Sequence, residues 1–259
     1  PYHGWTYGLD GALKTVTELE GVEDLDRSRL GLVPVRVATW HQLVFVCLDP
    51  SSPSLEDWLG ERLRTETAAL GLDRLRFVER REWTLACNWK VFVDNYLDGG
   101  YHVPFLHKGL NSILAFKEYR IECFDRACLQ SSPITSSEQN DAMTASVRKG
   151  HAAYYWLYPN LMLNWYEGYL DTNLVLPLGP DRMKVVFDFY FADVDGDEAR
   201  ARNRASIDVS AKIQDEDHAI CESVQRGLGS RAYRAGRLSV RREAGEHQFH
   251  RLLAADLRA

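Results

Sequence analysis

Cysteine is scarce in this sequence, and its spacing argues against a disulfide framework. The 259 residues include five cysteines, an odd number with wide spacing, and no Cys-x-x-Cys pair is present. Closely spaced cysteines in even number are the pattern of small disulfide-rich secreted domains. We therefore expect buried free thiols in a protein of the reducing cytoplasm.

The sequence also lacks an excess of basic charge and any long apolar run. The formal net charge is −6 at pH 7 and the pI is about 5.8, which argues against nucleic acid as a partner. Glu243 and Glu246 follow the basic run 234–242 at once, so a solvated face is the better interpretation of that run. No apolar run approaches the roughly 20 residues of a membrane span. Without internal repeats or low-complexity tracts, we expect one large domain or one and a half small ones.

The order of strand-like and helix-like segments indicates an α+β protein. With 45% hydrophobic and 11% aromatic residues, the chain can build a sizeable core. Segments rich in alternating, β-branched or aromatic residues predict strands, and apolar residues at helical spacing predict helices. The expected segments are strands with an Asp10-Gly11 hairpin turn over 1–50, a linker at 50–54, a helix over 55–70, a strand leading into a helix over 76–107, a polar loop over 130–150, aromatic strands over 152–193, and helices over 197–228 and 245–257. This order favours helices packed on an antiparallel sheet.

One short stretch, "DNYLDGGYHVPFLH" over 94–107, carries possible metal ligands. A mononuclear non-haem iron site needs two neutral imidazoles and one carboxylate on one face of the metal. His102 and His107 are five residues apart, which on an ideal helix separates the rings by about 140°. Pro104 and the glycines before His102 can distort the helix and turn both rings inward. Spacing alone leaves open that the two histidines are unrelated polar residues at a helix end.

The carboxylate for such a site must come from elsewhere in the chain. The segment "QDEDHAICESVQRGL" over 214–228 places three acids near the start of a helical run. Its apolar residues follow a helical period and predict one buried face; they are Ile220, Cys221, Val224 and Leu228. Asp217 lies on the turn that leads into that face, so we expect it to point inward, with Asp215 as the fallback. For Asp215 and Glu216, a favourable interaction with the helix N-terminus is the better interpretation.

Three segments together resemble a known family. The chain opens with "PYHGW", which after a cysteine would read C-P-Y-H-G-W, half of the ligand set of a Rieske [2Fe–2S] cluster. The segments "NWKVFVDNYLDGGYHVPFLH" and "EDHAICESVQRGL" resemble the iron-binding and late carboxylate segments of the same proteins. The chain therefore resembles the α-subunit of Rieske non-haem iron oxygenases, the ring-hydroxylating family, cut inside its cluster domain. Within this family it is most similar to the choline monooxygenase and betaine-demethylating branch.

The resemblance implies a role for individual residues. His102, His107 and Asp217 would bind a mononuclear Fe(II), and His3 would be one ligand of the [2Fe–2S] cluster, which the chain as given represents only in part. In the family, an acid three residues before the first iron-binding histidine relays the electron from the cluster of a neighbouring subunit. That position is Gly99 here, so the bridging role falls to Asp98, one residue earlier.

Other residues and the domain plan follow from the same resemblance. Asn95 would hydrogen-bond near the metal, whereas Asp94 is better read as helix polarity. The resemblance implies a remnant of an all-β Rieske domain over 1–50, a linker and helix over 51–80, and a catalytic domain with helix-grip-like architecture over 81–259.

The resemblance also implies the reaction and the partners. An NAD(P)H-dependent reductase, with or without a ferredoxin, would supply electrons to the cluster and then to the iron. The enzyme, an oxidoreductase, would use O2 to hydroxylate or dihydroxylate a small organic substrate. A homotrimer is implied, because the bridging acid links two subunits.

The substrate is open at this level. The strands over 152–193 carry many aromatic rings; they are Tyr154, Tyr155, Trp156, Tyr158, Trp165, Tyr166 and Tyr169. Such rings could bind a quaternary ammonium such as choline or betaine by cation–π attraction, or flank an aromatic compound, although most of them are expected to pack in the core. The loop over 130–150 is a candidate lid. Two other interpretations remain: a non-catalytic ligand-binding domain with a vestigial metal site, and a zinc hydrolase, which would leave the segment around His3 unexplained.

Overall fold

The chain divides into two compact units, and the first is built from short ribbons. The computed structural model describes residues 3–135 and 146–258, and the units are Pro1–Leu55 and Glu56–Ala259. The elements of the first unit are β1 (Thr6–Tyr7) paired with β2 (Leu13–Thr15), the 3-10 helix η1 (Arg27–Leu30), and β3 (Arg36–Trp40) paired with β4 (Leu43–Cys47). The predicted turn closes the first ribbon: Asp10 accepts a hydrogen bond from the Ala12 amide, and Gly11 has a φ of +81°. The expected domain boundaries, and the assignment of this unit to a cluster domain, stay predictions.

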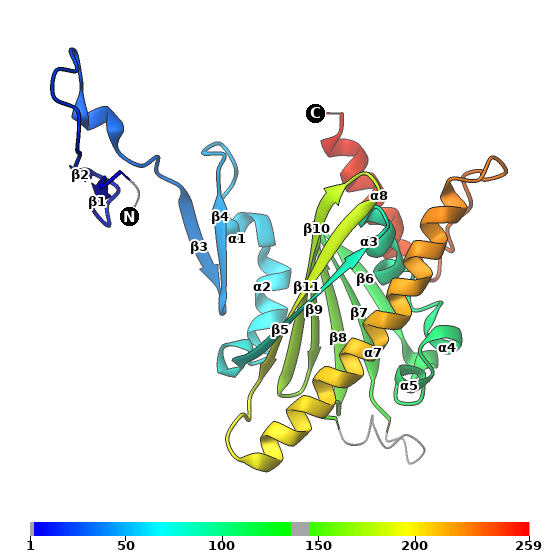
Figure 1. Cartoon of the computed structure of the whole chain (residues 1–259). Coiled ribbons are helices and arrows are strands. Elements are labelled where there is room, and N and C mark those ends of the chain that lie inside the picture. The colour runs from blue at the N-terminus through cyan, green and yellow to red at the C-terminus, as the bar shows by residue number, and fades with distance from the viewer. Residues whose placement is uncertain (1–2, 136–145, 259) are drawn as a thin grey trace. The chain divides into compact units, whose positions relative to one another are not determined.

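The second unit is organised around one seven-stranded antiparallel sheet (Figure 1). Its strands in chain order are β5 (Arg76–Leu85), β6 (Arg120–Phe124), β7 (Ala127–Pro133), β8 (His151–Leu157), β9 (Leu161–Tyr166), β10 (Tyr169–Gly179) and β11 (Arg182–Phe191). The spatial order is β5-β11-β10-β9-β8-β7-β6, so neighbours in the sheet are mostly neighbours in the sequence. The predicted α+β fold with an antiparallel sheet is confirmed.

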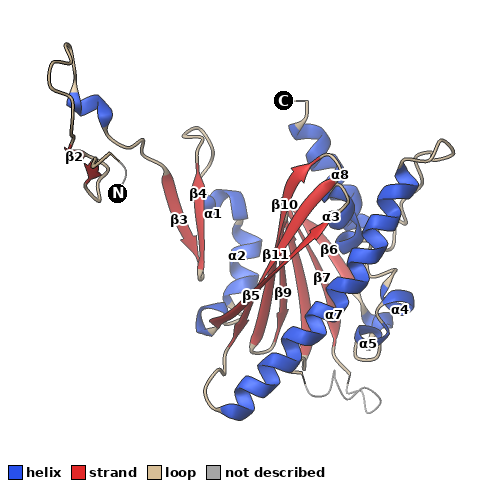
Figure 2. Cartoon of the chain, in the orientation of Figure 1, coloured by secondary structure: helices blue, strands red, loops and turns tan. Residues whose placement is uncertain are grey.

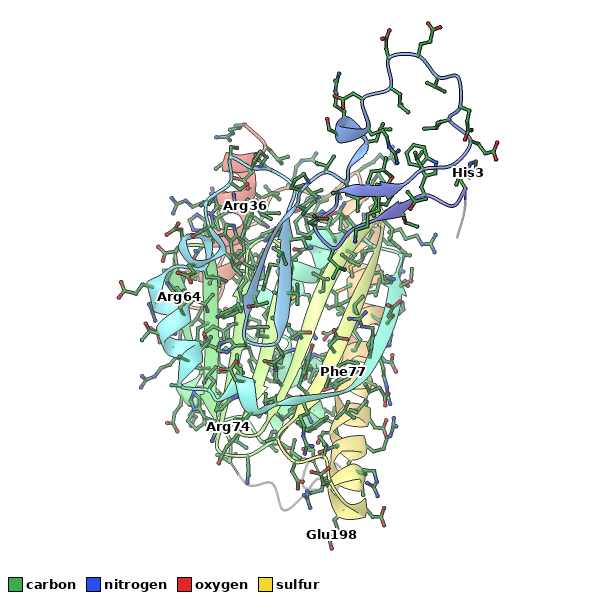
Figure 3. The ribbon with its side chains drawn as sticks, turned by 90° about the vertical axis from the view of Figure 1, so that its left-hand side faces the viewer. His3, Arg36, Arg64, Arg74, Phe77 and Glu198 are labelled. Carbon is green, nitrogen blue, oxygen red and sulfur yellow. The ribbon has the colours of Figure 1, made fainter. Side chains whose placement is uncertain are left out.

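Helices cover both faces of this sheet. They are α1 (Leu55–Leu59), α2 (Glu61–Ala68), η2 (Leu72–Arg74), α3 (Trp89–Leu97), α4 (Val103–Leu106), α5 (Lys108–Asn111), η3 (Phe116–Glu118), α7 (Asp197–Leu228) and α8 (Ala244–Asp256). The long helix α7 runs across one face (Figures 1 and 2), and the turned view of Figure 3 places α2 on the opposite face. Alternate strand residues serve the two faces. The indole N–H of Trp165 donates to the Leu70 carbonyl after α2, whereas the next residue, Tyr166, faces the α7 side.

The main core lies between the sheet and the layer of α3, α7 and α8. Phe249 of α8 is fully buried and makes edge-to-face contacts with Trp156 of β8 and Trp89 of α3, both at 5.6 Å between ring centroids. Such contacts add stabilisation beyond the burial of apolar area. They fix α3, which leads directly into the histidine segment, against the sheet.

Two expected segments differ from the structure. The helix expected over 55–70 is two helices, because Gly60 has a φ of +77° and interrupts the hydrogen-bond ladder between α1 and α2. The loop expected over 130–150 is wrong for 130–133, which extend β7 and pair with β8; polar residues such as Ser132 are buried in that ladder. The candidate lid falls mainly on 136–145, which lie outside the described residues.

The apolar face expected on the last third of α7 is also wrong. Cys221 is buried, but Ile220, Val224 and Leu228 are 36%, 44% and 38% exposed. A helical period identifies residues that share a face, but the buried face is chosen by what packs against the helix. Here half of the buried residues of α7 are polar; they are Asn203, Ser206, Ser210 and Gln214.

Two expectations from composition can be compared directly with the structure. All five cysteines are free, as predicted, with Cys87, Cys128 and Cys221 buried and the other two half-buried. Among the helices of residues 3–135 and 146–258, none combines the length and apolar character that crossing a membrane requires.

Candidate metal centre

The two histidines of the motif flank a short break in the helical path. α3 ends at Leu97, Gly99 and Gly100 follow with φ of +68° and +74°, and the single turn α4 then runs between His102 and His107. Because the helix is interrupted, the 140° separation of an uninterrupted helix does not apply. The imidazole centroids lie 4.9 Å apart, with the ring planes at 83°. The two glycines and Pro104 therefore lie where the helix is interrupted, as the sequence predicts.

Asp217 completes a three-residue cluster from the middle of α7. Its Oδ1 lies 3.1 Å from His107 Nε2 and 3.8 Å from His102 Nε2. One ligand atom from each of the three residues lies within 4.8 Å of the other two. Two imidazole nitrogens and one carboxylate oxygen are the donor set of mononuclear non-haem Fe(II) sites. His107 is buried and the other two are half-buried, so the cluster is accessible from one side.

Each histidine is oriented by a carboxylate at its other ring nitrogen. His102 Nδ1 lies 2.6 Å from Asp98 Oδ2, and His107 Nδ1 lies 2.7 Å from Glu216 Oε2. An imidazole whose Nδ1–H donates to a carboxylate presents the lone pair of Nε2, which is the atom that faces Asp217 in both cases. The donor set and its spacing therefore fit a divalent iron.

The electrostatics of His107 reflect the same neighbours. Burial lowers the pKa of His107, but hydrogen bonds and charges from Asp217 and Glu216 outweigh burial, so the net pKa is raised above its ordinary value. Two carboxylates around a buried imidazole make a site that attracts a cation.

Asn95 and Asp98, both predicted near the metal, lie in this cluster. Asn95 Nδ2 donates to Asp217 Oδ1 at 2.8 Å. Asp98 accepts from the amides of Gly100 and His102 in addition to the His102 ring, so it holds the turn as well as the ligand.

Gly99 occupies the usual position of the bridging acid in the family that the motifs resemble. A Cβ at Gly99 would lie 2.1 Å from the Arg242 carbonyl oxygen, so no side chain fits there. The carboxylate that contacts His102 therefore comes from one residue earlier, Asp98.

Glu216 is the residue of the site that sequence reasoning missed. The expectation that it serves a helix N-terminus is wrong, because α7 begins at Asp197 and the three acids lie in its interior. Asp215, the fallback ligand, accepts a hydrogen bond from the Trp83 indole and does not join the cluster. A signal was present in the sequence: the helix is predicted over 197–228, so the acids at 215–217 lie in its interior and have no terminus to stabilise.

The remaining candidates lie elsewhere. His3 belongs to the first unit, where its carbonyl accepts from the Thr17 hydroxyl, and its role as a cluster ligand stays a prediction. Asp94 binds His250 of α8 at 2.9 Å and, with Glu246, forms a second, more exposed group of possible ligands. The sequence interpretation treats Asp94 only as a polar residue of the helix, and it does not predict the contact with His250.

The candidate ligands open into a cavity of about 110 Å³, room for several waters or one small organic molecule. Aromatic residues from α3, β8, β9, β11 and the connection between η3 and β6 line it; they are Phe92, Tyr96, Tyr119, Tyr154, Tyr166 and Phe187. Polar residues share the lining; they are Gln130, Arg148, Asn164, Asp171, Asn173, Ser210 and Gln214. Of the seven rings singled out in the sequence, Tyr154 and Tyr166 line the cavity, and their hydroxyls hydrogen-bond at 2.8 Å. The other five serve the core or the opposite face, as expected for most of them.

Asp171 and Arg148 are buried charged groups in the polar wall of the cavity. Asp171 accepts hydrogen bonds from Asn164, Asn173 and Tyr169. Arg148 stacks over Tyr166 with its guanidinium carbon 5.1 Å from the ring centroid. The hydrogen bonds to Asp171 and the ring contact of Arg148 offset part of the cost of burying these charges.

Comparison with known proteins gives consistent results. Residues 72–259 match the family model described as ring hydroxylating alpha subunit (catalytic domain). Chloroplastic choline monooxygenase of Arabidopsis thaliana is 42% identical over 269 residues, covering 99% of this chain and 62% of that protein. The carnitine monooxygenase oxygenase subunit of Escherichia coli (strain K12) is 32% identical, with 98% and 70% covered. A solved structure of a quaternary ammonium Rieske monooxygenase has a TM-score of 0.85 at 27% identity, covering 98% of this chain and 71% of that one. The chain thus spans about three fifths of the length of the plant relatives.

Proposed function

The chain belongs to the family of ring-hydroxylating oxygenase α-subunits, and from this premise we propose that it carries the iron centre of a Rieske-type oxygenase. The observation that carries the proposal is the convergence of His102 Nε2, His107 Nε2 and Asp217 Oδ1 at the cavity. Bound Fe(II) would supply activation of O2 for hydroxylation of a C–H bond. A non-catalytic binding domain would have no use for this donor set, and that alternative is not favoured.

The contributions of the protein are positioning and control of the surroundings. Asp98 and Glu216 hold the imidazoles in the tautomer that presents Nε2. Asn95 restrains the Asp217 carboxylate by donating to Oδ1. The aromatic wall limits water around the reacting carbon, which protects an oxidising site from unproductive reactions.

The electron path is proposed from the family. Asp98 is our candidate for the acid that links the iron site to a cluster of a neighbouring subunit, and His3 for a ligand of that cluster. This arrangement needs a cyclic oligomer, for which we propose a homotrimer, and an NAD(P)H-dependent reductase with or without a ferredoxin. The cytoplasmic location stays a prediction, since the plant relatives are named as chloroplastic.

We propose a quaternary ammonium compound as the substrate. Relatives named for choline and carnitine support this class. The cavity is consistent with this class, because six aromatic side chains and the carboxylate of the buried Asp171 line it. Aromatic faces attract a quaternary ammonium by cation–π interaction. An aromatic substrate is the second candidate, since the same rings could flank a planar molecule.

The experiment that tests the iron centre is metal content per chain in the full-length protein. We expect about three irons, two in the cluster and one mononuclear, falling to about two in His102→Ala. His247→Ala is the matched control, because this histidine is exposed on α8 and belongs to neither group of possible ligands. Equal iron in the parent and in His102→Ala would overturn the proposed centre.

The substrate class needs a separate measurement. Substrate-dependent O2 consumption with choline-like and betaine-like compounds is compared with aromatic acids, using a suitable reductase. We expect turnover with the quaternary ammonium compounds. Turnover with the aromatic acids alone would favour the second candidate.

A further inference from the structure

The buried face of α7 forms a polar row that leads to the metal centre. Ser206, Ser210, Gln214 and Asp217 follow one another at helical spacing, and the last three line the cavity. Ser206 and Ser210 have partners within the protein: Ser206 accepts from the Val147 amide, and Ser210 accepts from Arg148. Gln214 differs from both.

The amide of Gln214 is buried without a hydrogen-bond partner. The residue is 1% exposed, and within residues 3–135 and 146–258 neither its Oε1 nor its Nε2 has a partner. Gln130, the other buried glutamine of the cavity, shows the usual arrangement: its Nε2 donates to the Tyr96 carbonyl and its Oε1 accepts from the Tyr119 hydroxyl. A buried unpaired amide is costly and rare. Since Gln214 lines the cavity, its partner is expected among the molecules that the cavity binds.

The place of Gln214 on the helix determines which part of a substrate it can reach. It precedes Asp217 by three residues, a rise of about 4.5 Å along the axis on the same face. A carbon held for oxidation at the metal would therefore have its own substituents, and those of the next atom, within reach of this amide.

The hydrogen-bonding capacity of the Gln214 amide limits which substrate group it can bind. Gln214 offers one acceptor and two donors. A hydroxyl group can both donate to Oε1 and accept from Nε2, whereas a carboxylate can only accept and the methyl groups of a quaternary ammonium do neither. We infer that Gln214 is a specificity-determining residue that binds a hydroxyl group on, or next to, the carbon that is oxidised. This inference rests on the proposed function and narrows its substrate class to hydroxyl-bearing quaternary ammonium compounds.

Calorimetric affinity, which is independent of turnover, tests the inference on the iron-loaded protein. The probes are choline, ethyltrimethylammonium, which lacks the hydroxyl, and glycine betaine, which has a carboxylate instead. We expect choline to bind roughly 10-fold or more tightly than ethyltrimethylammonium, because the analogue leaves the amide unpaired. In Gln214→Leu this preference should disappear through weaker choline binding, with the iron content unchanged.

Gln130→Leu is the matched control, and thermal unfolding gives a second reading. Gln130→Leu breaks two internal hydrogen bonds, so we expect a lower melting temperature and a retained choline preference. Gln214→Leu removes an amide with no internal partner, so its melting temperature should equal or exceed that of the parent. A loss in Gln214→Leu as large as in Gln130→Leu would make the amide structural and overturn the inference.

The binding outcomes separate this inference from the function beneath it. A choline preference that persists in Gln214→Leu, or tighter binding of glycine betaine than of choline, overturns the role of Gln214 alone. Absence of binding by all three probes in an iron-loaded parent overturns the proposed substrate class, and this inference with it. A preference that is lost only in Gln214→Leu supports both.

Discussion

At the scale of single residues, the candidate iron centre depends on carboxylates that are not themselves in the donor set. Asp98 and Glu216 each accept a hydrogen bond at Nδ1 of a histidine, and Asn95 donates to Asp217. Partners of this kind fix the orientation of a ligand and raise its basicity. Metal affinity should therefore respond to residues that the metal does not touch.

We predict that Glu216→Gln lowers iron affinity by about 10-fold, because the charge that supports the His107 imidazole is lost. Asp215→Asn is the matched control: it removes the neighbouring charge, whose partner is the indole N–H of the half-buried Trp83. The measurement is iron loss over time in the presence of a chelator. Equal loss from both variants would contradict a specific role for Glu216.

At the scale of elements, the turn between α3 and α4 positions the histidine pair. Gly99 has a φ of +68° and lies against the Arg242 carbonyl, while Arg242 stacks on Phe116 with 4.2 Å between the guanidinium carbon and the ring centroid. The segment before α8 thus holds the turn that carries Asp98 and His102. Because the Arg242 carbonyl lies so close to the backbone of residue 99, this position requires glycine.

We predict that Gly99→Ala destabilises the protein by about 3 kcal/mol, from backbone strain together with a steric clash. Gly168→Ala is the matched control. Gly168 has a similar φ of +77°, but the nearest atom to a new Cβ is 3.8 Å away, so only the strain of about 1–2 kcal/mol applies. Urea unfolding measures both. A Gly99→Ala variant no less stable than Gly168→Ala would show that the turn can move away from Arg242.

The elements also show how far the sequence could predict this site. Local patterns were sufficient for β5, for the strands β8 to β11, for α3 and for the break between His102 and His107. They predicted no strand over 120–133, where β6 and β7 lie. They were insufficient for Glu216, because its contact with His107 spans 109 positions of the sequence. The buried polar residues of α7 were also missed, because polar residues on a helix normally face solvent. Ser210 and Gln214 line the cavity, and no local pattern indicates a cavity.

At the scale of the whole molecule, α8 closes the C-terminal side of the second unit and introduces a pH dependence of stability. Burial, together with the charges of Asp94 and Glu243, raises the pKa of Glu246 to about 7, against the opposing effect of His250. The ordinary value of 4.5 applies when the chain is unfolded. Between these two values the folded protein binds more protons than the unfolded chain, so this carboxyl makes stability fall as pH rises from 4.5 to 7.

We predict that Glu246→Gln is more stable than the parent at pH 8, by about 1–2 kcal/mol once solvent screening of this half-buried group is allowed for. At pH 4.5 the two proteins should have nearly equal stability, because the folded parent then holds the proton and its neutral carboxyl resembles the amide. Urea unfolding at the two pH values, with a chelator present to keep cations from Asp94, Glu246 and His250, measures the difference. A stability difference that is the same at both pH values would mean that the proton on Glu246 is not its source. It would place the effect in packing of α8 against α3 instead.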